Sequence, residues 1–348
     1  MIEFVRSLYK SRRLIKELVG RDLKARYVGS SMGFFWSVIY PLLNLVVYTF
    51  VFRVILSTRF DDKAGVANVA IWMLAGILVW GAFAETLSRA TNCLVENANL
   101  IQKVVFPAGV LPVYLAISSI INMAIGLPVV LIGVFYFGYI HTPAEVSEGP
   151  EEVAVVASNV QEAHELPGGV ELPKDTRTAA CNHCDFEHVL LCPNDGSAMR
   201  ILRIADGPPE EVPEAKPLAL GFTLIALPLL MLLQAVFTVG LGLFLSAFNL
   251  ILRDTFHLVG VFIIVWMFST PIFYPPTMIT AAKHGGKYDF VLEYNPMYWL
   301  IECYRNVLLN NSWPDPALLG TFAGVAVVVF VLGATFFNSQ RDSFPDLL

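Results

Sequence analysis

Six uncharged stretches run along this chain, and each is long enough to cross a lipid bilayer as a helix. About 20 helical residues span the hydrocarbon core. The stretches cover residues 30–52, 64–84, 104–140, 217–252, 255–282 and 316–340. The longest contain internal prolines, so we expect tilts, kinks or loop residues to absorb their excess length. These prolines are Pro107, Pro112, Pro128 and Pro228. The pattern predicts an all-α membrane protein with six transmembrane helices.

The polar interruption between the fourth and fifth stretches is only two residues long. Arg253 and Asp254 stand between two apolar runs. Because a charge at mid-depth in the bilayer is costly, this pair predicts a tight turn at the membrane surface. The fifth stretch then meets Pro271, Pro275 and Pro276. Proline cannot continue a regular helix, so we expect the fifth helix to break there.

Composition and charge define the class of protein and its orientation. Hydrophobic residues make up 56% of the chain and charged residues only 15%. Soluble domains contain about a quarter charged residues, so the composition indicates an integral membrane protein. Eight lysines and arginines fall within the first 30 residues, which predicts a cytoplasmic N-terminus. Six crossings then return the C-terminus to the cytoplasm. The first apolar stretch starts too late for a cleavable signal peptide.

Residues 8–28 are predicted to form a basic amphipathic helix on the membrane surface. The apolar side chains recur at steps of four or seven residues, at Leu8, Ile15, Val19 and Leu23. A basic amphipathic helix just before a span is an interfacial element. The pattern by itself indicates an anchor that sets topology. The basic candidates on this helix are Lys16, Arg21, Lys24 and Arg26.

The first stretch carries an aromatic stripe that is a candidate substrate path. Its members follow at steps of four, which keeps them on about half of the helix surface. They are Trp36, Tyr40, Asn44, Tyr48 and Phe52, of which the first four are the candidate path. Aromatic faces beside hydroxyl and amide groups suit sugar rings. The alternative is packing or an interfacial belt, which Trp36 near the helix end fits best.

Residues 141–216 interrupt the apolar pattern with prolines and fifteen acidic residues against five basic ones. After three crossings this segment lies outside the cell membrane. Its core reads CNHCDFEHVLLCPNDG. A zinc-ribbon-like site would use Cys181, Cys184 and Cys192 with Asp195, His183 or His188 as fourth ligand. A disulfide plus one free thiol is the alternative, because the outer compartment is oxidising.

Residues 277–314 are too polar for a simple crossing. The motif YNPMYWLIECYRNVLL is long enough for a half-membrane helix. Polar segments at membrane depth persist where they line a cavity. We expect either a re-entrant hairpin before the last span or an interfacial helix outside. Three parts follow: residues 1–140 with the surface helix and spans one to three, 141–216 as an external acidic insertion, and 217–348 with the remaining spans and the hairpin.

The sequence lacks the motifs of enzymes and of ion-coupled carriers. It contains no Gly-rich phosphate loop, serine elbow or H-E-x-x-H motif. The spans hold no chain of mid-membrane charges of the kind that proton- or sodium-driven carriers use. We therefore expect a transporter without a cofactor in its membrane region, no nucleic-acid partner, and energy supplied by a separate subunit.

Four segments resemble the permease subunits of ABC-2 exporters, in the branch that exports O-antigen, capsular polysaccharide or teichoic acid. LRDTFHLV with TPIFYP resembles a cytoplasmic coupling turn and the fifth span of that family. LIKELVGRDLKARYVGSSMGFFWSVIYPLLN resembles the gate helix leading into the first span. ENANLIQKVVFPAGVLPV resembles the first coupling helix. The NPM motif with the later YR pair resembles a re-entrant helix at the extracellular mouth.

The resemblance implies a homodimeric permease of the bacterial cytoplasmic (inner) membrane that exports a lipid-linked polysaccharide such as O-antigen. A separate ABC ATPase would drive it. The residues facing that ATPase would be Glu96, Asn97, Asn99, Leu100, Ile101, Lys103, Arg253 and Asp254. The family usually has a short loop in place of residues 141–216, so the resemblance does not explain this segment. Two alternatives are an ABC-2 exporter of a lipid or drug, and a membrane-anchored metal-binding sensor or enzyme.

Overall fold

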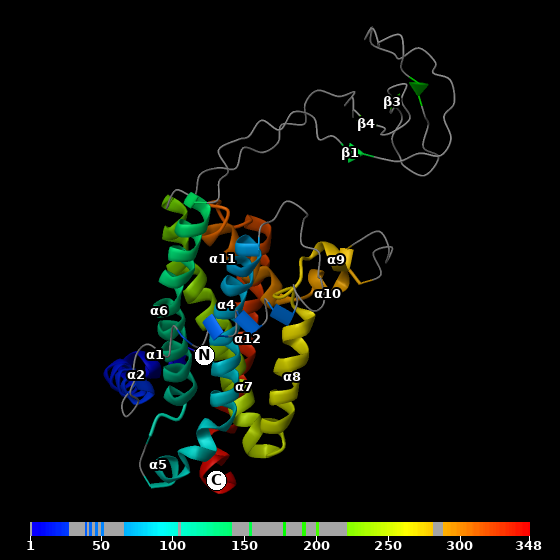
Figure 1. The fold of residues 1–348 in the computed structure, drawn as a ribbon. Helices are drawn as coiled ribbons and strands as arrows, with labels where there is room; N and C mark the ends of the chain where they lie inside the picture. The colour runs from blue at the N-terminus through cyan, green and yellow to red at the C-terminus, as the bar shows by residue number, and fades with distance from the viewer. Residues whose placement is uncertain are drawn as a thin grey trace. The chain divides into compact units, whose positions relative to one another are not determined.

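The computed structural model of the chain divides into two compact units. One comprises Met1–Ile140 with Pro217–Leu348, and the other comprises His141–Lys216. The structure describes residues 2–27, 39, 42–43, 46–47, 50–51, 66–103, 106–140, 153–154, 177–178, 190–192, 200–201, 221–280 and 288–348. The described part of the first unit is helical (Figure 1).

Four helices in the described part of the chain are long and apolar enough to cross a membrane. They are α4 (Val66–Glu96), α6 (Val110–Ile140), α7 (Leu227–Ile251) with the preceding 3₁₀ turn η3 (Phe222–Ala226), and α12 (Pro316–Gln340). Most of the predicted first span, 30–52, lies outside the described residues. Helix α8 (Thr255–Ser269) is apolar but shorter. A multi-pass helical membrane unit is therefore confirmed, while the count of six spans stays a prediction.

The prolines act at helix boundaries more than within helices. Pro107 lies in the loop before α6, and Pro228 stands in the first turn of α7, where its missing N–H has no partner to lose. Pro128 is the exception inside α6. The predicted turn at Arg253 and Asp254 is confirmed between α7 and α8.

The predicted end of the fifth helix is also confirmed. Helix α8 ends at Ser269, two residues before Pro271. Three short helices follow along the chain: α9 (Thr277–Thr280), α10 (Phe290–Glu293) and α11 (Pro296–Leu308). Of these, α11 packs into the bundle against α4, α7 and α12.

Two predicted boundaries are wrong. The predicted span 64–84 continues as α4 to Glu96, because Glu and Arg are good helix formers and their charges end an apolar run without ending a helix; Glu85 and Arg89 in this extension pair with Arg26 and Asp22. The N-terminal segment is not one helix over 8–28. It forms α1 (Ile2–Lys10) and α2 (Arg12–Tyr27), separated at Ser11, whose N–H donates to the carbonyls of Ser7 and Leu8.

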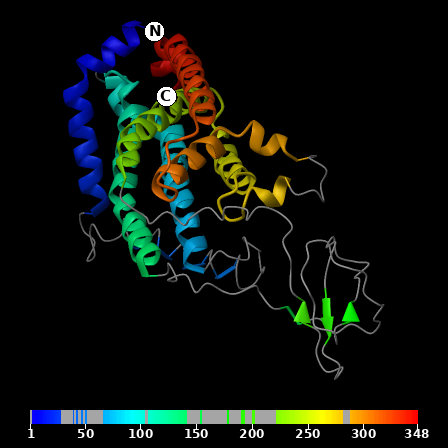
Figure 2. The same ribbon diagram turned by 90° about the horizontal axis from the view of Figure 1, so that it is seen from above.

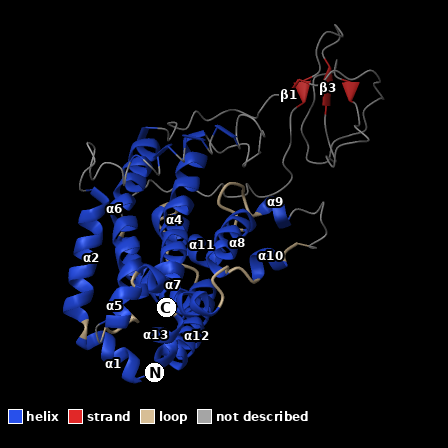
Figure 3. Cartoon of the chain, turned by 90° about the horizontal axis from the view of Figure 1, so that it is seen from below, coloured by secondary structure: helices blue, strands red, loops and turns tan. Residues whose placement is uncertain are grey.

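Helix α2 is docked on the bundle along one side. It packs against α6, and Figures 2 and 3 show the two helices running beside each other. Phe4 of α1 is buried against Phe337 of α12, with ring centroids 6.2 Å apart. Within the predicted surface helix, Val19 of α2 is buried in the same way, so this helix has an apolar contact with the protein itself.

Helix α7 is the central element of the bundle. It packs against α4, α6, α11 and, most extensively, α12. At the crossing with α12, a Cβ on Gly333 would lie 2.0 Å from the carbonyl oxygen of Gly240, and a Cβ on Gly240 would lie 2.6 Å from Cα of Phe330. Only glycine allows the two backbones to approach so closely. Small residues at helix crossings are a common device of membrane proteins.

The second unit contains four short strands among its described residues. β1 (Val153–Ala154) pairs antiparallel with β4 (Arg200–Ile201), and β2 (Arg177–Thr178) pairs antiparallel with β3 (Leu190–Cys192). The candidate ligands Cys181, Cys184 and Asp195 lie outside the described residues, as do His183 and His188. For Cys192 the structure describes only a backbone position in β3.

The glycine crossing gives a first prediction. Gly333→Ala should lower the free energy of unfolding by about 1–3 kcal/mol, because the added methyl group overpacks the α7–α12 contact. Thermal unfolding of the detergent-purified protein measures the change. Gly324→Ala on the same helix is the matched control, since a Cβ there meets nothing within 4 Å. Equal losses in the two variants would contradict a special role for the crossing.

Candidate functional site

The predicted ATPase-facing residues lie together at one end of the first unit. Helix α5 (Ala98–Lys103), the α7–α8 turn and the C-terminus are all at the lower end in Figure 1. The terminal helix α13 (Phe344–Leu347), which follows the 3₁₀ turn η5 (Arg341–Ser343), packs against α5 and α7. Segments far apart in the sequence thus form one end surface.

Most of the predicted ATPase-facing side chains on this end surface are exposed. Arg253 and Asp254 are exposed on the turn. On the α4–α5 corner the exposed side chains are Glu96, Asn99, Leu100 and Lys103, and the half-buried ones are Asn97 and Ile101. Asn97 stabilises the corner, because its side chain donates to the carbonyl of Cys93 at 2.8 Å.

A carboxylate on the inner side of α2 joins three helices. Asp22 accepts hydrogen bonds from Nη1 of Arg89 on α4 and from Nε of Arg26 on its own helix, each at 3.1 Å. Nη2 of Arg89 and the hydroxyl of Ser118 on α6 also donate to it. The Asp22 side chain is only 11% exposed. This carboxylate therefore fixes α2 to both helices of the α4–α6 pair.

A second carboxylate closes the arrangement into a ring of charges. Glu85 on α4 contacts Nη2 of Arg26 and accepts from Nη1 of Arg89 at 3.2 Å. Each arginine thus pairs with both Glu85 and Asp22. Two cations and two anions balance, so the ring carries no net charge. Networks of this kind are stronger than isolated exposed pairs.

The ring sets the protonation state of Asp22. Partial burial by itself raises the pKa of this carboxyl group, but the hydrogen bonds from Arg89 and Ser118 and the charges of Arg89 and Arg26 outweigh it. Together they lower the pKa of Asp22 from its ordinary 3.8 to about 2. Asp22 therefore stays ionised at an acidity that would protonate most free Asp carboxyl groups.

Sequence reasoning identified only one member of the ring. Of the four predicted basic residues of this helix, Arg26 pairs with Asp22 and Glu85, whereas Lys16, Arg21 and Lys24 are exposed. The missed residues are Asp22, Glu85, Arg89 and Ser118. Their i,i+4 acid–base spacing is visible in the sequence and indicates helix pairs. The meeting of α2 with α4 is a tertiary contact that this spacing does not contain.

The far end of α8 is held by one asparagine. The side-chain oxygen of Asn295 accepts from Nε1 of Trp266 at 3.0 Å and from the backbone N–H groups of Met297 and Tyr298 at 3.1 and 3.3 Å. Its amide donates to the hydroxyl of Thr270 at 3.0 Å. Asn295 therefore caps α11 and ties its start to the end of α8.

A buried arginine fixes α11 to the bundle. Arg305 is 1% exposed, and its Nη1 donates to the carbonyl of Pro271 at 3.0 Å and to Glu302 at 2.7 Å. Its guanidinium lies 3.2 Å from the ring centroid of Trp72 on α4. A buried cation is costly unless its partners compensate it, so these contacts hold Arg305 in one position. The motif residues that follow Asn295 thus hold α11 in place between α4 and the bend after α8.

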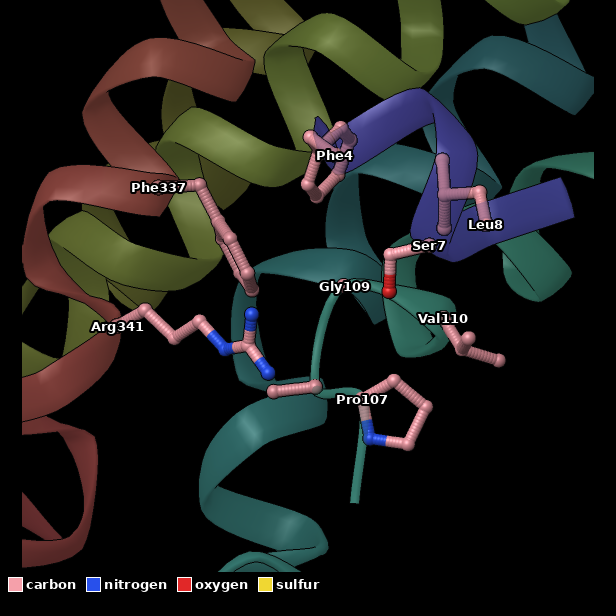
Figure 4. A pocket seen from close by; sticks show the side chains of 9 residues that line it. Phe4, Ser7, Leu8, Pro107, Gly109, Val110, Phe337 and Arg341 are labelled. Atoms are coloured by element: carbon pink, nitrogen blue, oxygen red, sulfur yellow. The ribbon is translucent and has the colours of Figure 1, made fainter. Parts of the chain in front are cut away.

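A small cavity lies between α1, the start of α6 and the end of α12 (Figure 4). It is lined by Phe4, Ser7, Leu8, Pro107, Ala108, Gly109, Val110, Phe337 and Arg341. The lining is mostly apolar, and Arg341 reaches its edge. The cavity is a packing gap beneath α1, too small for a sugar.

The remaining predicted sites fall outside the described side chains. Trp36, Tyr40, Asn44 and Tyr48 are not among the described residues, so the aromatic path stays a prediction. Within the described part of the chain, no group of three His, Cys, Asp or Glu residues is placed to hold a metal ion. The zinc site predicted at the insertion cysteines is not tested by this finding.

Comparison with known proteins gives one family and several relatives. A family model described as "ABC-2 type transporter" matches residues 13–155 and 216–309. The O-antigen export system permease protein RfbA of Myxococcus xanthus is 25% identical over 346 residues, or 99% of each chain. Two proteins of the same name from Klebsiella pneumoniae are 21% and 20% identical over 335 residues, 96% of this chain and 95% of theirs. The family model leaves 156–215 unmatched, whereas the Myxococcus alignment spans nearly the whole chain.

The lowered pKa of Asp22 predicts a pH-dependent stability. Its folded pKa lies below its ordinary value, so its contribution is complete above about pH 5 and is lost as the pH falls through about 2. Asp22→Asn should therefore unfold at a lower temperature than the wild type at about pH 5–7, and most of the difference should be gone by about pH 2. Thermal unfolding of both purified proteins across this range measures it. A difference that stays the same down to the acid end would contradict the ring.

Proposed function

The chain belongs to the ABC-2 type transporter family, and we propose that it is the permease subunit of an exporter that moves a lipid-linked polysaccharide, such as O-antigen, across the bacterial inner membrane. The observation that carries the proposal is the end-to-end match to relatives named as O-antigen export permeases. The permease itself is a transporter without an enzymatic motif. ATP hydrolysis belongs to a separate ATPase subunit.

The end surface of the first unit is where that ATPase docks. The α4–α5 corner and the α7–α8 turn lie at the same end and present exposed charges. Both are mechanically connected to spanning helices, because α4 continues directly into the corner and α7 and α8 meet at the turn. A displacement of the α4–α5 corner or of the α7–α8 turn by the ATPase is therefore transmitted to the helix bundle.

Two copies of the chain enclose the transport path. One face of α8 has few protein contacts: only Thr255 and Val259 are buried among its described side chains. Its exposed apolar residues include Leu258, Val261, Phe262, Ile264, Val265 and Phe268. Lipid or a second copy covers such a face. One bundle is too small to surround a sugar polymer, so a two-fold dimer with the path between protomers fits best.

The two ends of the path are controlled by different elements. Helix α2 is the gate at the cytoplasmic end, and α9 to α11 form the re-entrant region at the outer mouth, held by Asn295 and Arg305. Trp36, Tyr40, Asn44 and Tyr48 line the path between them. Both termini lie in the cytoplasm. This placement is supported by the aromatic side chain of Phe337, which packs against Phe4 near one end of the chain and against Phe344 near the other. The insertion, residues 141–216, acts at the outer end of the path. Bound zinc or a disulfide stabilises it.

A deletion strain tests the exported substrate. Without this protein, the lipid-linked polysaccharide should accumulate at the cytoplasmic face, and surface polysaccharide should disappear until the gene is restored. Antibody labelling of intact and permeabilised cells measures both pools. A normal surface polysaccharide combined with altered export of a lipid or drug would assign the protein to the other branch of exporters.

Reversing the charges of the α7–α8 turn tests the ATPase contact. The double variant Arg253→Asp with Asp254→Arg should lower export by on the order of tenfold, because mismatched charges at an interface weaken docking. ATP hydrolysis and dimer assembly should persist. The matched control is Arg253→Lys with Asp254→Glu, which keeps the sign of both charges at the same positions. Wild-type export by the turn variant would overturn the assignment of this contact.

A further inference from the structure

We propose that Asp22 is the positioning residue that locks α2 closed, and that the lock opens and reforms in each export cycle. The inference rests on the proposed function of α2 as the cytoplasmic gate and names the group that controls it. The ring of charges joins α2 to α4, and Ser118 on α6 donates a hydrogen bond to its Asp22.

Asp22 is the position in the ring whose loss removes the hydrogen bond from α2 to α6 together with most links from α2 to α4. Its carboxylate serves donors from Arg26, Arg89 and Ser118, which stand on three helices. Removing any single donor leaves the carboxylate two others. Removing the carboxylate leaves the buried hydroxyl of Ser118 without its acceptor and leaves Arg26 and Arg89 with Glu85 alone, which is the costly direction.

Helix α2 depends on this ring because it has little core of its own. Val19 is the only apolar side chain buried among the described residues of α2, at 7% exposure. In α11, by contrast, nine of thirteen residues are buried. An element with few apolar contacts and one concentrated polar attachment separates as a unit when that attachment breaks.

The ring can open because it is not sealed from water. The side chains of Glu85 and Arg89 remain partly exposed, so water can replace their protein partners when the helices part. A fully buried ring would be left with uncompensated charges on opening. This intermediate burial suits a contact that is strong when closed and reversible.

The same helix carries the lock and the ATPase-facing corner. Arg89 and Glu96 both lie on α4, about seven residues and therefore about 10 Å apart along the helix. A displacement of the α4–α5 corner by the ATPase therefore moves Arg89 and Glu85 relative to α2. The ring of charges therefore transmits an ATPase-driven movement of α4 to the gate helix α2.

A thiol introduced at position 19 reports directly on the lock. Val19→Cys is placed in a chain whose five native cysteines are replaced by alanine, and the purified permease is treated with a water-soluble maleimide. Labelling should be slow in this parent and about tenfold faster once Asp22→Asn is added, because the amide removes the negative charge and replaces one acceptor oxygen with a donor group that faces Arg26, Arg89 and Ser118. Asp22→Glu keeps the charge and should stay close to the parent rate.

The control makes the same charge change on the same helix. Glu17 is exposed on α2, and Glu17→Gln should leave the labelling rate of the introduced thiol unchanged. If Asp22→Asn does not fold, Ser118→Ala removes a single donor and should still raise the rate above that of the parent. Equal rates in the parent, in Asp22→Asn and in Ser118→Ala would overturn the lock.

Transport measurements distinguish a contact that opens in each export cycle from one that only stabilises the fold. With the ATPase bound, ATP should speed labelling of the introduced thiol in the parent, and Asp22→Asn should hydrolyse ATP with less polysaccharide exported per ATP. Release of α2 without any change in that ratio would overturn its function as a gate. The labelling assay needs no substrate, so a wild-type exporter that moves no polysaccharide would refute the proposed function and leave the lock standing.

Discussion

The close contact of α7 with α12 at Gly240 and Gly333 fixes the frame on which the other helices depend. Both helices are candidate spans, and α7 also packs against α4, α6 and α11. Between helices in a membrane there is little hydrophobic driving force, so the closeness of packing decides which pairs stay together. The α7–α12 pair is therefore the rigid centre, and elements that touch it only through other helices are the ones able to move.

Contacts around this centre differ in kind from end to end. Toward the proposed outer mouth, the hydrogen bonds of Asn295 and the buried guanidinium of Arg305 hold α11 tightly among apolar side chains. Near the proposed gate, α2 is attached through a ring of charges that is partly open to water. The contacts of α11 thus keep it fixed, whereas the contacts of α2 allow it to separate from the bundle. A transporter driven from the cytoplasm needs this asymmetry.

The apolar pattern predicted the elements that the bilayer dictates and missed those that depend on tertiary contacts. The bounds of α12, the turn at Arg253 and the end of α8 before Pro271 follow from hydropathy and proline chemistry, which are local. The extension of α4 to Glu96 and the partners of Asp22 do not, because a charge ends a predicted span unless another helix neutralises it. The motif around Asn295 was recognised, but its bond to Thr270 required the fold.

The central claim is that this chain passes a lipid-linked polysaccharide through the membrane when a separate ATPase drives it. Purified permease and ATPase, reconstituted in vesicles that carry the lipid-linked polymer, test it most directly. The account predicts that ATP moves the polymer from the ATPase side to the opposite face, where an added glycosidase cleaves it. No movement should occur with the permease alone. Sustained ATP hydrolysis without any polymer reaching the far face would contradict the account.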